Sequence, residues 1–388
     1  MVAVTAAGRI WKFGLESEDA VEAEVARREQ AEADDDEEEV KVNHREDGRG
    51  SLASVFHTRP IVNVGFLGQE DPRLASVDES GKILVTNSTD GKVKQVLQLG
   101  SSQACFATCP TGKYAISGAS DDGIIRIIHT SAHVQLTVSD HVRVGDSPVV
   151  LVAIKQESKE THAFAAVTED DKVHLGRITA DGAVNVLGNA ALGGLAVDAS
   201  LNVDVDGGSP AQLVLAGMAG SGANERPALW AVDFPALDFE ATNEELPGDA
   251  VSVIVNHIGN ADDVPPTCIT VATPNSGTEK TDKVLVGMAD GCVAQYALPC
   301  AENVATDVRA ELPCVVVAQS SNPHKGPVTG VEVVRAPDGQ TIICSASVDG
   351  AVKTTPLPTA GRDSVGGQRG TLIHFHSFKH FFCAHKHF

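Results

Sequence analysis

Aromatic side chains are scarce in this sequence: Phe, Trp and Tyr make up 4% of its 388 residues, whereas all hydrophobic types make up 42%. A core of small and β-branched side chains suits many short strands, because these side chains pack well on a pleated surface. Long apolar runs are also absent, and none approaches the roughly 20 residues that a membrane-spanning helix requires. The composition therefore indicates an all-β fold, with no membrane span in this chain.

Signatures of catalysis and of cofactor binding are missing as well. The sequence contains no G-x-S-x-G, H-E-x-x-H or P-loop motif, so it offers no nucleophile elbow, catalytic zinc site or phosphate loop. Its eight cysteines include no C-x-x-C pair, which argues against a structural metal site and favours a reduced intracellular compartment. We therefore expect a protein that is not an enzyme and that binds neither a cofactor nor a metal.

Basic residues are outnumbered, since 30 Lys and Arg stand against 52 Asp and Glu, a formal net charge of −22. Proteins that bind nucleic acids need a basic surface to neutralise phosphates, so direct binding to DNA or RNA is disfavoured. The expected partners are other proteins.

Half of the net charge lies in one short segment. Residues 16–47 contain 15 acidic and 4 basic side chains, centred on ADDDEEEV at residues 33–40. Like charges at this density repel one another, and the segment has too few apolar groups to offset the entropy of ordering. We therefore predict a disordered insertion over residues 16–50. Its acidic core is also a candidate docking surface for a basic partner, formed by Asp34, Asp35, Asp36, Glu37, Glu38 and Glu39.

A hairpin pattern recurs through the chain, in which a small or apolar strand, a turn and an alternating strand follow one another. After the first copy the spacing is roughly 40 to 60 residues, the period of a propeller blade. The segments between hairpins supply inner and outer strands, and four short antiparallel strands repeated about an axis predict a seven-bladed β-propeller. The seven hairpins begin at Val2, Arg73, Tyr114, Ala163, Leu213, Lys283 and Thr341.

The last of these units, residues 322–358, resembles a WD repeat. In that family a His before the inner strand, a Ser or Thr on the next strand, an Asp in the tight turn and a Trp on the third strand share a hydrogen-bonded network. The resemblance implies a propeller of degenerate WD-like repeats, in which these polar side chains are structural. The matching residues are His324, Ser345 or Ser347, and Asp349, with Thr355 at the Trp position.

Two further turns carry the Asp of this pattern. Asp122 and Asp290 are each followed by Gly. An Asp in such a turn can accept hydrogen bonds from nearby backbone N–H groups. We predict a structural role for both, as for Asp349.

The two ends depart from the repeat. The first hairpin has no inner strand before it, and we expect the last blade to lack its outer strand, so we interpret the propeller as incomplete at the N-terminus. The final 19 residues contain five His and five Phe, a composition foreign to the repeats that suggests non-native coding sequence. The predicted domains are a first-blade hairpin (1–15), the acidic insertion (16–50), the rest of the propeller (51–360) and a non-propeller tail (361–388).

Three functions are consistent with this architecture. The first is a non-catalytic scaffold for protein–protein interactions in a multiprotein complex, with the cytoplasm as the expected location. The second follows from similarity to the ER-membrane WD-repeat proteins that activate the small GTPase of COPII coat assembly. Those proteins share an early charged insertion, a long-turned blade like residues 219–234 and a last blade ending like residues 345–362, and the similarity implies guanine nucleotide exchange at the ER surface. The third is a WD-repeat subunit of a ribosome-assembly particle, which implies the nucleolus.

Overall fold

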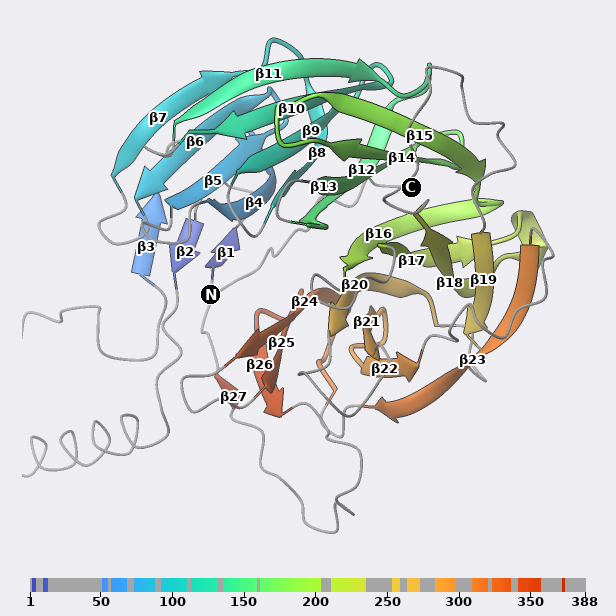
Figure 1. Ribbon diagram of the computed structural model, residues 1–388. Coiled ribbons are helices and arrows are strands. Elements are labelled where there is room, and N and C mark those ends of the chain that lie inside the picture. The colour runs from blue at the N-terminus through green and yellow to red at the C-terminus, as the bar shows by residue number, and fades with distance from the viewer. Residues whose placement is uncertain are drawn as a thin grey trace, which may run out of the picture.

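The structure is a computed structural model of the 388-residue chain. Small antiparallel sheets lie side by side around a common centre (Figure 1). The residues described by the structure are 2–4, 10–12, 51–54, 57–67, 73–87, 92–109, 113–131, 135–158, 161–203, 211–234, 253–258, 264–272, 283–297, 309–319, 323–335, 341–356 and 372–373.

The repeating unit is a set of four strands that follow one another in the sequence and lie side by side, from the innermost strand outwards. The first three such units, which we call blades, are β4 (Ile61–Leu67), β5 (Arg73–Asp78), β6 (Lys82–Asn87) and β7 (Val93–Gln98); β8 (Gln103–Thr108), β9 (Tyr114–Ala119), β10 (Ile124–Thr130) and β11 (Leu136–Arg143); and β12 (Val149–Gln156), β13 (His162–Thr168), β14 (Lys172–Ile178) and β15 (Val184–Ala191).

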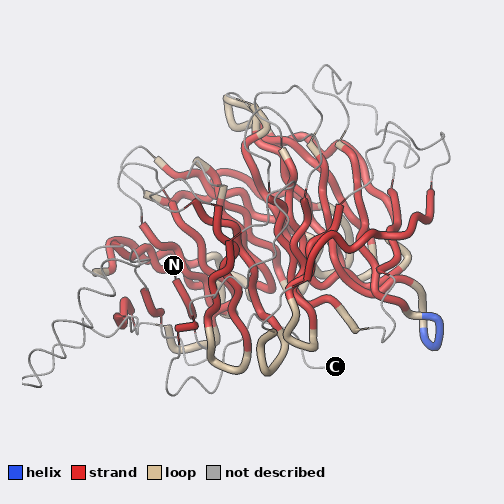
Figure 2. Tube along the Cα trace, turned by 90° about the horizontal axis from the view of Figure 1, so that it is seen from below, coloured by secondary structure: helices blue, strands red, loops and turns tan. Residues whose placement is uncertain are grey.

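Three more blades complete the described set. Their strands are β16 (Gly194–Asn202), β17 (Gln212–Ala219), β18 (Arg226–Asp233) and β19 (Val253–Ile258); β20 (Pro266–Ala272), β21 (Lys283–Met288), β22 (Val293–Ala297) and β23 (Arg309–Gln319); and β24 (Val328–Arg335), β25 (Thr341–Ser347), β26 (Val352–Pro356) and β27 (Leu372–Ile373). The strands run between two faces on which loops gather, and the short 3-10 turn η1 (Gly222–Asn224) projects from one of them (Figure 2).

The hairpins expected from the sequence are present as antiparallel pairs, and each expected inner strand lies where the repeat predicts it. The first hairpin forms a separate sheet of β1 (Val2–Val4), β2 (Ile10–Lys12) and β3 (Ser51–Ser54). The all-β, WD-repeat-like propeller is therefore confirmed as the fold. Among the described strands this first sheet has three members, so seven complete blades remain a prediction.

β1 lies next to the first complete blade, since it contacts β4. In other blades both the innermost and the second strand contact the innermost strand of the blade that follows, as β4 and β5 both contact β8. The contact of β1 with β4 agrees with either position, so a propeller that is incomplete at the N-terminus stays a prediction.

The outer strands differ from the expectation in two places. β19 pairs in parallel with β23, from Val253 with Arg309 to Ile258 with Cys314, so two neighbouring blades form one eight-stranded sheet. The expectation that the last blade lacks its outer strand is wrong, because β27 pairs with β26 through Val352 and Lys353. A ladder of two residues carries no alternating pattern, so the sequence gives no sign of it.

Apolar side chains between neighbouring blades form the core. One cluster packs Val77 and Ile83 of the first complete blade (β4–β7) against Phe106 and Ile128 of the next. Trp230 is fully buried in another, and its Nε1 donates a hydrogen bond to the Leu192 carbonyl 3.0 Å away. A single blade cannot cover both of its faces, so the stacking of neighbours buries the apolar surface.

Hydrogen bonds from side chains also link each innermost strand to the next. Asp198 on β16 accepts the backbone N–H of Ile269 on β20 at 2.8 Å, and Asn63 on β4 donates to the Phe106 carbonyl on β8 at 2.7 Å. The other links are Cys105 to Val149, Lys155 to Leu201, and Thr267 to Val328. Short polar side chains thus take part in holding the six innermost strands β4, β8, β12, β16, β20 and β24 together.

Candidate functional site

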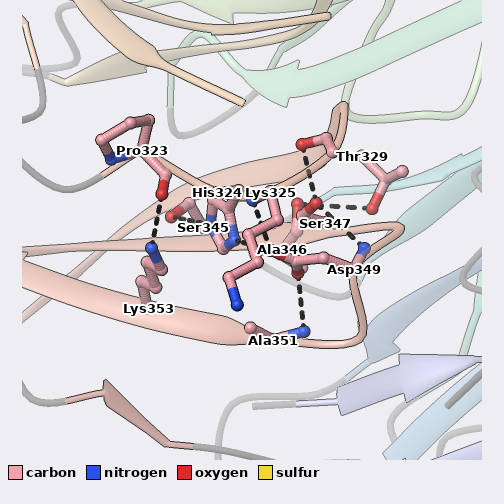
Figure 3. A network of polar contacts seen from close by, with 11 residues as sticks. Pro323, His324, Lys325, Thr329, Ser345, Ala346, Ser347, Asp349, Ala351 and Lys353 are labelled. Carbon is pink, nitrogen blue, oxygen red and sulfur yellow. Dashed lines mark hydrogen bonds and ion pairs between the residues drawn. The ribbon is translucent and has the colours of Figure 1, made fainter. Parts of the chain in front are cut away.

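The polar residues matched in the last blade lie together in one network (Figure 3). The Nε2 of His324, in the loop before β24, is 2.9 Å from Ser345 Oγ on β25, and its Nδ1 is 3.4 Å from Asp349 Oδ2. Asp349 accepts the backbone N–H groups of Ala351, in its own turn, and of Lys325, in the incoming loop, both at 2.8 Å. The carboxylate therefore joins the turn to the loop that enters the blade.

Ser347, the alternative match to the hydroxyl position, contacts the backbone instead. Its hydroxyl donates to the Gly326 carbonyl at 2.9 Å and accepts the N–H of Asp349 at 3.2 Å. Thr355, at the Trp position, is exposed on β26. The network of this blade therefore consists of His324, Ser345 and Asp349.

A second network, which was not predicted from the sequence, lies in the first complete blade. His57 precedes β4, with its Nε2 2.7 Å from Ser76 Oγ and its Nδ1 2.9 Å from Asp78 Oδ2. Asp78 Oδ1 accepts the backbone N–H groups of Ser80 and Lys82 at 3.0 and 3.1 Å. The side chains of His57 and Asp78 are fully enclosed. The spacing from His to Ser, 19 residues here and 21 in the last blade, is the signal that could have revealed it.

The two networks differ because the Ser and the Asp near the turn have exchanged positions. Asp78 and Ser347 are the last residues of β5 and β25, and the carbonyl of each accepts the N–H of a positive-φ glycine three residues later. Asp78 therefore stands where the last blade has Ser347, and Ser80 stands where that blade has Asp349. The Ser80 hydroxyl donates to Asp78 Oδ1 at 2.6 Å. The carboxylate has moved two residues towards the N-terminus, yet it still reaches the same imidazole nitrogen.

Asp122 and Asp290 lie in the corresponding turns of their own blades. Asp122 Oδ1 accepts the backbone N–H of Ile124 at 3.0 Å, and Asp290 Oδ1 accepts that of Cys292 at 2.9 Å. Each bond runs to the residue two positions later, as the bond from Asp349 to Ala351 does. Both carboxylates therefore satisfy a donor of the turn.

The glycine after the turn Asp is a contact point between blades. The carbonyl of Gly291, whose φ is +90°, accepts the N–H of His324 at 2.9 Å, so one turn is bonded to the network of the next blade. A Cβ on Gly291 would lie 2.2 Å from the His324 carbonyl oxygen. Only a residue without a side chain fits there without a shift of the backbone.

Burial and pairing set the charge of each network. Desolvation lowers the pKa of His57 and of His324, although the facing Asp78 and Asp349 oppose this change. Desolvation raises the pKa of Asp78 and Asp349, but hydrogen bonds, led by those from Ser80 and from the Lys325 backbone, outweigh it and leave both pKa values lowered. Near neutral pH each network therefore pairs a neutral imidazole with an ionised carboxylate.

Ser76, His57 and Asp78 have the connectivity of a catalytic Ser-His-Asp triad, with the hydroxyl at Nε2 and the carboxylate at Nδ1. Ser76 and Asp78 are 0% exposed and His57 is 5% exposed. A nucleophile must reach a substrate carbonyl, and an enclosed Ser76 hydroxyl cannot. The network of Ser76, His57 and Asp78 therefore has a structural role.

Other predicted sites fall outside this geometry. The six acidic residues of the candidate docking surface, Asp34 to Glu39, lie outside the described residues, so their role stays a prediction. Among the residues that the structure describes, no group of three or more His, Cys, Asp or Glu is placed to hold a metal ion. The same residues include no helix that is long and apolar enough to cross a membrane.

Comparisons with known proteins support the fold. No family model matches the chain, and no curated protein matches its sequence. The structure of U3-55K is similar, with 15% identity over 77% of each chain and a TM-score of 0.50. The computationally designed Ika8 protein (16% identity, 92% of each chain, TM-score 0.49) and the β-propeller domain of Myceliophteria thermophila Cps50 (Swd1) (14% identity, 81% of this chain and 85% of that one, TM-score 0.47) are more weakly similar in structure. At such identities the likeness to U3-55K concerns the fold alone.

Proposed function

We propose that this chain is a non-catalytic scaffold that holds other proteins together in a multiprotein complex. The observation that carries the proposal is that the polar networks of His57 and His324 are buried and have a structural role. The side chains that could form a triad are buried within the first complete blade, and both networks bond a turn to an incoming loop. Exposed loops on a rigid framework are an arrangement that suits the binding of proteins.

The acidic segment, residues 16–50, is the surface that we assign to a basic partner. Its charge supports this assignment, because residues 16–47 within it carry half of the net charge of the chain. Exposed charges attract a complementary surface over about 8 Å at physiological ionic strength, so they raise the rate of association and make it sensitive to salt.

The test is to replace residues 16–50 by a short Gly-Ser linker and to compare the proteins that co-elute in stoichiometric amounts with the full chain and with the variant. The melting temperature should stay within a few degrees, since doubling the length of a closed loop changes its closure cost by only about 0.6 kcal/mol. A basic partner should be lost, and the lost affinity should be the part that falls as salt rises.

A matched control keeps the length of the segment and removes its charge, by changing Asp34, Asp35 and Asp36 to Asn and Glu37, Glu38 and Glu39 to Gln. Loss of the partner with this variant would assign the effect to charge. The scaffold proposal fails if the full chain elutes alone, with no other protein in stoichiometric amount, under conditions where it is folded.

Guanine nucleotide exchange on a small GTPase is the second candidate. It is favoured by the long β17–β18 turn with η1 at its tip, where Ser221, Gly222 and Asn224 are exposed. The purified chain should then accelerate the release of a fluorescent GDP analogue from its GTPase at least tenfold. Unchanged release would remove this candidate and leave the scaffold, while co-elution with pre-ribosomal proteins would indicate the ribosome-assembly alternative.

A further inference from the structure

Arg126 is a buried cation in the middle of β10. Its side chain is 7% exposed, and its Nε and Nη1 are enclosed without a hydrogen-bond partner. Within the described part of the chain no carboxylate forms an ion pair with it. A guanidinium stays protonated at any pH that a protein tolerates, so its burial cannot be relieved by the loss of a proton.

Among the described residues, neither neighbouring strand places a carboxylate in an ion pair with Arg126. Ser117 pairs with Arg126 on β9, but its hydroxyl is directed to Gln103 Oε1 at 2.7 Å. On the other side Arg126 pairs with His141 of β11, and the neighbouring Asp140 uses its Oδ1 to accept the His141 backbone N–H at 2.7 Å. A buried charge without a partner is far more costly than a buried polar group with one.

Equivalent positions in other blades show that the propeller does not need a free cation here. The partner of Ser76 in the first complete blade is Leu84, an apolar residue. The partner of Ser345 in the last blade is Lys353, whose Nζ donates to the Pro323 carbonyl at 2.8 Å. The position thus accepts either an apolar side chain or a satisfied cation, whereas Arg126 is a cation with no ion-pair partner among the residues that the structure describes.

We propose that Arg126 is the centre of a binding site for an oxyanion, a carboxylate or phosphate group. The planar guanidinium can give two parallel N–H bonds to such a group. The site is independent of the proposed scaffold function, since it depends on the burial of one residue and on no particular partner.

The experiment titrates the purified full chain with inorganic phosphate and, in a separate arm, with acetate, at constant ionic strength, while calorimetry records binding. We expect one site per chain that saturates in the millimolar range, together with a saturating rise of several degrees in the melting temperature. Saturation separates a site from the general stabilisation by phosphate salts, which grows steadily with concentration. Binding of phosphate alone would identify a phosphoryl group, and equal binding of acetate would identify a carboxylate.

Two variants locate the site. Arg126→Met keeps the length of the side chain and removes the charge; it should abolish saturable binding and, without added anion, melt at or above the temperature of the parent. Arg143→Met, on the adjacent β11, removes an exposed arginine whose side chain is 57% exposed and should bind as the parent does. The proposal is overturned if the parent shows no saturable binding, or if Arg126→Met binds as well as the parent. Should Arg126→Met not fold, Arg126→Lys keeps the charge but loses the planar fork and should bind the anion more weakly than the parent, and equal binding would overturn the proposal.

Discussion

At the scale of single residues, the two networks show that the carboxylate must lie close to the His side chain in space, whereas its residue position in the turn can differ. In the last blade the carboxylate comes from the turn at Asp349, and in the first complete blade it comes from the end of the strand at Asp78. Both reach Nδ1 of a buried His and accept N–H groups of the turn. The tight turn brings the two origins within reach of the same imidazole. This explains why a motif defined by fixed spacing found one network and missed the other.

This equivalence predicts the outcome of a reciprocal exchange in the first complete blade. Asp78→Ser alone should lower the free energy of unfolding by about 2–3 kcal/mol, because it leaves buried donors without an acceptor. Adding Ser80→Asp restores a carboxylate at the position that Asp349 occupies in the last blade, and the double variant should regain most of the loss. Chemical denaturation of the two single variants and the double variant gives the coupling energy. Additive effects in the double variant would contradict the equivalence.

His162 makes the stability of the protein depend on pH. Desolvation, with a smaller contribution from Lys113, lowers the pKa of His162 to about 4. The ring is 2% exposed and lies edge-on to Tyr114 at 5.0 Å. The unfolded chain takes up a proton near pH 6.5, whereas the folded chain does so only near pH 4. The stabilisation is therefore complete above pH 6.5 and is lost as the pH falls towards 4, by about 3 kcal/mol at most.

His162→Phe keeps a ring beside Tyr114 and removes the titrating group. Denaturation at a series of pH values should show a smaller loss of unfolding free energy between pH 6.5 and 4 in this variant than in the parent. The same change at the exposed His141 serves as the control. Equal slopes for the parent and for His162→Phe would show that another group carries the acid sensitivity.

At the scale of the elements, the turn between the second and third strands is where neighbouring blades are joined. Gly291 is required for two separate reasons: its φ is positive, and the backbone that leads into the next blade lies where a Cβ would be. For Gly100, with φ +78°, only the first reason applies, since nothing lies within 4 Å of the position that a Cβ would take there. A comparison of substitutions at Gly100 and Gly291 therefore separates the cost of backbone strain from the cost of steric overlap.

Substitution by Ala should reveal this difference. Gly100→Ala should cost about 1–2 kcal/mol, the penalty for a left-handed conformation in an L-residue. Gly291→Ala should cost clearly more, because its Cβ would overlap the His324 carbonyl and push the two blades apart. The difference in melting temperature between the two variants measures the contact between blades. If both variants melted at the same temperature, the turn would not join the blades as described.

The sequence predicted the hairpins and the inner strands well because these are local features. Strand alternation and turn residues lie within about 15 residues of each other, so the repeat can be read directly. The outer strand β19 was not predicted, because 19 residues (234–252) separate it from its antiparallel partner β18, and its other partner, β23, is a parallel strand that begins only at Arg309. The network of His57 was missed because its Asp ends a strand and does not lie in the turn.

At the scale of the whole molecule, contacts between blades join the separate sheets into one propeller. Side-chain hydrogen bonds link successive innermost strands, apolar clusters fill the spaces between sheets, and the β19–β23 pairing joins two blades at the rim. The networks of His57 and His324 belong to this framework. It follows that their loss should weaken the fold before it affects any association with partners.

The most direct test of this account measures stability and association on the same variant, Asp349→Ala. The account predicts that the free energy of unfolding falls by about 1–2 kcal/mol, because the N–H groups of Lys325 and Ala351 lose their acceptor. It also predicts that the variant, kept at low temperature where it is folded, binds the partners of the parent with unchanged affinity. Loss of those partners with an unchanged unfolding free energy would contradict it, because Asp349 would then be part of a binding site.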